Sequence, residues 1–85
     1  DFAPHLTTIQ RNECTIMVAA ADMLVRAGKA PAALQIYENL FARRDLPDNL
    51  RLIWLREAIK VANADHDMGR SIRWEQEAAR LSVSQ

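Results

Sequence analysis

Apolar residues recur at helical spacing along four segments of this chain. Thr7 and Gln10 have the spacing of a capping box, so the first helix is expected to begin near Thr8. Gly28 can adopt the left-handed conformation that closes a helix, which places the end there. The predicted inward stripe consists of Ile9, Ile16, Met17, Ala20, Met23, Leu24 and Ala27. We expect this helix to be the most buried of the four.

A second helix is predicted before Pro47 and a third helix after it. Pro31 fits the first turn of the second helix, because its ring fixes φ and its missing N–H would have no intrahelical partner. The inward residues of this helix are Ala33, Leu34, Tyr37, Leu40 and Phe41. Pro47 then interrupts the pattern, and Asp48 can cap a third helix over about 49–64. Its predicted core side is Leu50, Ile53, Trp54, Ala58, Val61 and Ala62.

A polar stretch over 63–69 predicts the next connection, with Asp65 or Asp67 capping a fourth helix. That helix has a narrow apolar stripe of Met68, Ile72, Trp74, Ala78 and Leu81. No alternation of apolar and polar residues lasts long enough to indicate a strand. The pattern therefore predicts an all-α fold of antiparallel helix-turn-helix pairs.

The size of the chain favours one domain. With 85 residues it supports a single modest core, so we expect one helical domain over 1–85. Its predicted parts are a flexible N-terminal segment at 1–6, a first helical pair at 7–46, a second at 47–82 and a tail at 83–85. The chain begins with Asp1 rather than Met, which is typical of an excised segment or a processed product.

Charge and hydropathy disfavour two classes of partner. The 11 basic and 11 acidic residues cancel, which removes the broad attraction used to bind nucleic acids or anionic membranes. A local basic patch would have to come from Arg43, Arg44, Arg51, Arg56, Arg70 and Arg73. No apolar stretch approaches the roughly 18 residues that span a bilayer. We expect a soluble, cytoplasmic protein without membrane insertion.

Few residues of the chain are candidates for a catalytic role. Cys14 lies in an apolar run, where a small packed thiol is common, and it has no second cysteine to pair with. His5 and His66 belong to no recognisable catalytic pattern. The sequence thus predicts neither an enzyme nor a cofactor or small-molecule substrate.

A calcium loop is the nearest match to a metal motif. Asn63, Asp65 and Asp67 have the alternating spacing of the first three ligands. The glycine should stand at Met68, and the twelfth position would be Trp74 where the loop requires an acid. Capping of a helix is the preferred interpretation, and no metal site is predicted.

The first helical pair resembles a tetratricopeptide repeat. In the order of the family's Trp-x2-Leu-Gly-x2-Tyr and Ala-x3-Phe signatures, the matching residues are Met17, Ala20, Ala21, Leu24, Ala33 and Tyr37. Met17 replaces the large aromatic residue, and Asp45 occupies the usual proline position. The resemblance covers about residues 14–81, although any antiparallel bundle with short turns has similar periodicity.

The second pair matches this family less well. Trp54 and Ala58 fit its first helix, but Glu57 falls where an apolar residue belongs. Arg70 lands on the small-residue position, which Ser71 would occupy if the turn had one extra residue. We interpret this pair as a degenerate repeat.

The resemblance implies a non-catalytic scaffold or chaperone-like module that holds a peptide or helix of a partner protein in a concave face. By family position, the binding residues are Asn12, Thr15, Asp22, Arg51, Arg56 and Lys60. The charged members fit an ordinary solvated surface equally well. Trp74 is added as an anchor, on the condition that its ring is exposed.

Two other functions stay open at this point. Because two helical pairs leave apolar surface uncovered, the chain could self-associate as a structural subunit of a larger assembly, such as a bacterial secretion machine. A helical nucleic-acid-binding domain is the lesser alternative.

Overall fold

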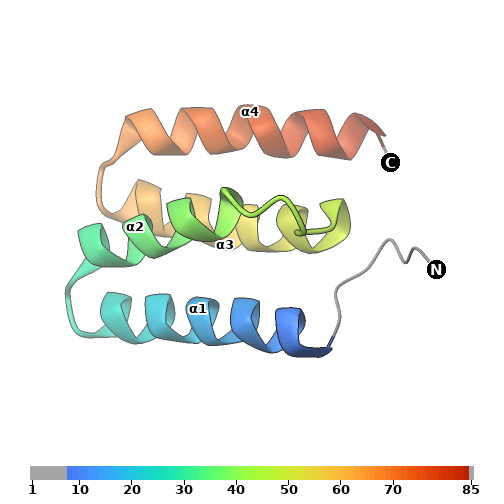
Figure 1. Cartoon of the computed structure of the whole chain (residues 1–85). Coiled ribbons are helices and arrows are strands. Elements are labelled where there is room, and N and C mark those ends of the chain that lie inside the picture. Colours follow the sequence, from blue (N-terminus) through green and yellow to red (C-terminus); the bar gives the residue numbers. More distant parts are fainter. Residues whose placement is uncertain (1–7, 85) are drawn as a thin grey trace. The chain divides into compact units, whose positions relative to one another are not determined.

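The computed structural model describes residues 8–84 and contains four helices: α1 (Thr8–Arg26), α2 (Ala30–Phe41), α3 (Asp48–Ala64) and α4 (Met68–Ser84) (Figure 1). No strand occurs among these residues, so the predicted all-α class is confirmed. The flexible segment predicted at 1–6 lies outside the described residues. The predicted tail at 83–85 is helical as far as Ser84.

The four helices form two compact units, and the chain passes from one to the other between Pro47 and Asp48. In unit 1, α1 packs on α2, and in unit 2, α3 packs on α4. Each unit is therefore an antiparallel helical hairpin (Figure 1). Pro47 cannot continue a helix and Asp48 begins α3, so the boundary falls where the sequence predicts a break.

Both hairpins turn with the same hydrogen-bond pattern. In unit 1, the N–H of Lys29 donates to the Leu24 carbonyl at 2.8 Å and that of Gly28 to Val25 at 3.0 Å. In unit 2, the N–H of Asp67 donates to Ala62 at 2.8 Å. These bonds satisfy carbonyls that a helix end would otherwise leave without partners, as in a Schellman motif.

The residue that makes each turn has a positive φ, 78° at Gly28 and 59° at His66. His66 follows Gly28 by 38 positions, and α4 begins 38 positions after α2. Tetratricopeptide units repeat every 34 residues or so, which makes this spacing longer. Ser71 stands 38 positions after Ala33, and both are buried. Ser71 is therefore the counterpart of Ala33 in the second hairpin.

The core of unit 1 follows the prediction on α2 but not on α1. Four of the five predicted residues of α2 are buried: Ala33, Leu34, Tyr37 and Leu40. The rings of Tyr37 and Phe41 stack with centroids 6.0 Å apart. On α1 the buried residues are Cys14 and Ala21, which are small enough to allow close approach of α2.

The predicted stripe of α1 was wrong in three of its large residues. The exposed fraction is 72% for Ile9, 67% for Ile16 and 70% for Met23. Since α1 is apolar around much of its circumference, periodicity alone does not select the buried face. In the structure, the line of small residues of α1 packs against α2. Fewer residues are buried on α1 than on α2, so the expectation that α1 is the most buried helix was wrong.

In unit 2, both helices contribute to the core. Its buried residues are Leu52, Leu55, Ala58 and Ala62 of α3 with Ser71, Trp74 and Leu81 of α4. The Ser71 hydroxyl donates to the side-chain oxygen of the exposed Asn63, so the buried hydroxyl has a hydrogen-bond partner. Ile53, Met68 and Ile72 were predicted to face inward, and they are exposed. They are exposed because α3 and α4 each bury only the side that faces the other helix of the hairpin.

Glycine should be the more stable residue at the left-handed position of both turns. Gly28→Ala should lower the free energy of unfolding by about 1 kcal/mol because alanine is strained at positive φ, although its Cβ would meet nothing within 4 Å. His66→Gly should raise it by roughly 1 kcal/mol for the same reason. Urea unfolding followed by circular dichroism measures both. A gain on Gly28→Ala would contradict the left-handed turn.

Candidate functional site

Asp67 caps the N-terminus of α4, which is the role that the sequence analysis preferred to calcium binding. Its Oδ1 accepts the backbone N–H of Arg70 at 3.2 Å, and its Oδ2 lies 2.7 Å from Nη1 of the same arginine. These two bonds hold the pKa of the Asp67 carboxyl below its usual range. Within residues 8–84, no three His, Cys, Asp or Glu side chains gather as metal ligands would.

The Cys14 side chain is fully buried in unit 1. Burial raises the pKa of its thiol, and the nearby Arg43 only partly opposes the effect. A protonated, inaccessible thiol is a poor nucleophile, so Cys14 has the properties of a packing residue. His66 is exposed in the turn between α3 and α4, and His5 lies outside the described residues.

The exposed side of α1 carries three large apolar side chains. Ile9, Ile16 and Met23 are seven residues apart, which places them on one line opposite Cys14 and Ala21. Asn12 and Ala19 are exposed between them on the same line. We call these five residues the α1 outer face. A row of exposed large apolar side chains is a candidate interaction surface on a folded protein.

The binding residues predicted on α1 are all exposed beside this face. Asn12 belongs to the face, and Thr15 and Asp22 lie along one edge of it. Nε of Arg26 lies 2.9 Å from a carboxylate oxygen of Asp22 one turn earlier. The sequence analysis thus placed these polar residues on the surface, where they lie, but assigned the exposed apolar residues beside them to the core. The buried side differs from the exposed one in the small size of Cys14 and Ala21, because Ile9, Ile16 and Met23 share the same seven-residue spacing.

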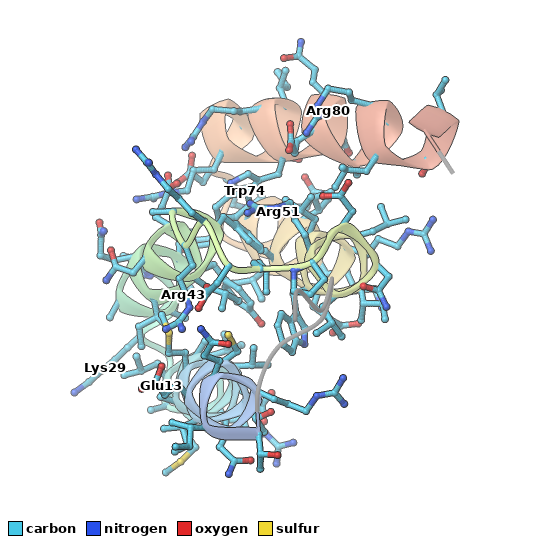
Figure 2. The ribbon with its side chains drawn as sticks, turned by 45° about the vertical axis from the view of Figure 1, so that its right-hand side comes forward. Glu13, Lys29, Arg43, Arg51, Trp74 and Arg80 are labelled. Carbon is cyan, nitrogen blue, oxygen red and sulfur yellow. The ribbon has the colours of Figure 1, made fainter. Side chains whose placement is uncertain are left out.

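In unit 2, the predicted residues have different surroundings. Arg56 and Lys60 are exposed on α3 near the exposed Ile53, and Nζ of Lys60 lies 3.5 Å from Glu57. Arg51 is half-buried, and its charge helps the bonded Arg80 to lower the pKa of Glu77 (Figure 2). Arg51 therefore takes part in an ionic cluster within its own hairpin.

Trp74 does not meet the condition set for an anchor. Only 3% of its surface is exposed, because it shares the buried face of α4 with Ser71 and Leu81. The guanidinium of Arg73 lies 5.9 Å from the centroid of its ring. Trp74 is therefore a core residue of the apolar stripe predicted for this helix, and Arg73 partly covers its ring.

Arg43 joins the end of α2 to α1 in unit 1 (Figure 2). Its Nη2 lies 3.0 Å from Oε1 of Glu13 and 2.9 Å from Oδ2 of Asp45, and its Nε donates to Asp45 Oδ1 at 3.0 Å. The two-bond contact holds the pKa of Asp45 below its usual range. This cluster fixes α1 against α2 at the end opposite the turn, which orients the α1 outer face.

None of the helices in residues 8–84 combines the length and the apolar character needed to cross a bilayer. Comparison of the chain with protein-family models, curated proteins and solved structures finds no match.

The Arg43 cluster predicts a pH-dependent loss of stability. Arg43→Met should lower the free energy of unfolding by about 1 kcal/mol at pH 7, while Arg44→Met, at an exposed neighbour, should change it little. Because the Asp45 pKa is lowered by folding, its contribution is present above the ordinary value of 3.8 and is lost as the pH falls through the folded value. Urea unfolding at pH 7 and pH 2 should show the difference between Arg43→Met and the parent shrinking in acid. An equal difference at both pH values would contradict this role of Asp45.

Proposed function

We propose that this chain is a non-catalytic protein-interaction module whose α1 outer face binds an amphipathic helix of a protein partner. The observation that carries the proposal is the line of Ile9, Ile16 and Met23, each at least two-thirds exposed. Covering large apolar side chains of this kind stabilises a complex by about 1.5–3 kcal/mol for each one fully buried.

The spacing of the line favours a helical partner. Large side chains seven residues apart present one contact every two turns, which is the repeat of two helices packed along each other. An extended peptide would instead meet alternate residues at short spacing. Asn12, Thr15 and Asp22 beside the line offer hydrogen bonds and charge that can select among helices.

The exposed residues of α3 support the same class of function. Ile53, Arg56 and Lys60 combine an apolar side chain with positive charge on the surface of unit 2. A tetratricopeptide-like stack would bring them to the same concave face as Asn12 and Asp22. That stacking, the scaffold or chaperone-like role and the cytoplasmic location stay predictions.

A nucleic-acid-binding function has less support. Phosphate binding needs cationic side chains that are available to the ligand. Two of the six arginines named for a basic patch, Arg43 and Arg70, each lie within 3.0 Å of a carboxylate oxygen. A neutral chain with carboxylates beside its arginines favours a protein partner.

A designed peptide can test the proposal without knowledge of the natural partner. The probe is a fluorescein-labelled three-heptad helix with leucine at both core positions of each heptad, titrated with the full chain and followed by anisotropy. We expect saturable binding that Ile16→Lys weakens by about tenfold or more. The matched control Ile72→Lys changes an exposed isoleucine of α4 and should bind like the parent. Absence of binding, or equal binding by both variants, would contradict the proposal.

A further inference from the structure

The three methionines and the single cysteine of the chain differ in their access to solvent. Met23, on the α1 outer face, is 70% exposed, and Met68, at the start of α4, is 55% exposed. Met17 is half-buried, and Cys14 is fully buried. The most exposed sulfur-containing side chain therefore lies in the surface proposed to bind the partner.

The neighbours of Met23 on α1 leave its thioether uncovered. The positions four and three residues before it, which adjoin it on the helix surface, are Ala19 and Ala20. A long side chain in a helix leans toward the preceding turn, so Met23 extends over these two alanines. Their side chains end at Cβ, two bonds short of the position of the Met23 sulfur. Arg26, three residues after Met23, is bonded instead to Asp22 at 2.9 Å.

The thiol of Cys14 is poorly suited to react before this thioether. Peroxide oxidises a cysteine through its thiolate form. Cys14 is fully buried, and burial raises the pKa of its thiol, so little thiolate forms at neutral pH. A thioether has no proton to lose, and its reaction with peroxide depends mainly on its exposure. An oxidant in solution should therefore modify Met23 while Cys14 stays reduced.

We propose that oxidation of Met23 by hydrogen peroxide regulates partner binding at the α1 outer face. The sulfur attacks one peroxide oxygen with a lone pair, the O–O bond breaks, and the other oxygen leaves as water after proton transfer. The sulfur is oxidised by two electrons to a sulfoxide, and the peroxide is reduced by two electrons. This inference rests on the proposed function, because it names the regulation of the same surface.

The sulfoxide changes one end of the face from apolar to polar. Its oxygen accepts hydrogen bonds, which water supplies while the surface is free. A partner helix that covers Met23 removes this water, and the apolar side chains of that helix offer no donor in return. Ile9 and Ile16 carry no sulfur and stay apolar. We therefore expect oxidation to weaken binding by about tenfold without abolishing it.

Peptide mass spectrometry of the full chain after timed exposure to hydrogen peroxide tests the first step. Met23 and Met68 should be oxidised nearly as fast as in urea, and the half-buried Met17 should be oxidised several-fold more slowly than in urea. Circular dichroism verifies that the chain keeps its helices at an exposure that leaves Met17 unmodified. Protection of Met23 as strong as that of Met17 would overturn the inference.

The leucine heptad probe tests the consequence for binding. Peroxide should weaken binding by the parent about tenfold, and the two methionine sulfoxide reductases, one for each sulfoxide epimer, should restore it. Met23→Leu keeps an apolar side chain of similar size and should bind equally before and after peroxide. The matched control Met68→Leu should lose affinity on oxidation as the parent does, because it retains Met23.

The outcomes separate this inference from the proposed function. If the reduced parent binds the probe and the oxidised parent binds it equally well, the inference is overturned and the proposed function stands. The same holds if Met23→Leu loses as much affinity on oxidation as the parent. A reduced parent that binds no probe would overturn both.

Discussion

The contact between small residues of α1 and α2 determines how the rest of unit 1 is arranged. Cys14 and Ala21 of α1 and Ala33 of α2 are completely buried, and side chains of this size let two helices pack at short distance. Once this line of α1 faces α2, the opposite line must face outward. The exposure of Ile16 is thus a consequence of the hairpin contact, and the proposed binding surface depends on it.

The ends of the hairpin hold this contact in place. At one end a left-handed residue, Gly28, reverses the chain, and at the other Arg43 bonds to Glu13 and Asp45. Unit 2 repeats the turn with His66, and Asp67 caps the helix that follows. The two units therefore share the same turn geometry, and they differ in the polar residues around the turn.

Much of this architecture could be predicted from the sequence. The capping pattern and Gly28 predicted both ends of α1, and Pro31 the start of α2, to within two residues, because each acts through local backbone geometry. The inward stripe of α2 was also predictable, since its opposite side carries polar residues such as Gln35 and Asn39. Local signals of this kind do not depend on how the helices pack.

The side of α1 that is buried could not be predicted in the same way. Apolar residues surround most of that helix, so the choice depends on fit against α2 and not on hydropathy. For this reason Ile9, Ile16 and Met23 were assigned to the core, while Asn12, Thr15 and Asp22 were correctly placed on the surface. The burial of Trp74 likewise depends on the packing of α4.

The reactivity of thiols at positions 14 and 16 tests the orientation of α1 most directly. Cys14 is the only cysteine, so the parent and the double variant Cys14→Ala/Ile16→Cys each carry a single thiol. Both would be labelled with Ellman's reagent under native conditions, at a dilution where sedimentation gives a monomer. The account predicts that the thiol at position 16 reacts as fast as in urea and that Cys14 is strongly protected. Rapid labelling of Cys14 together with protection at position 16 would contradict the account.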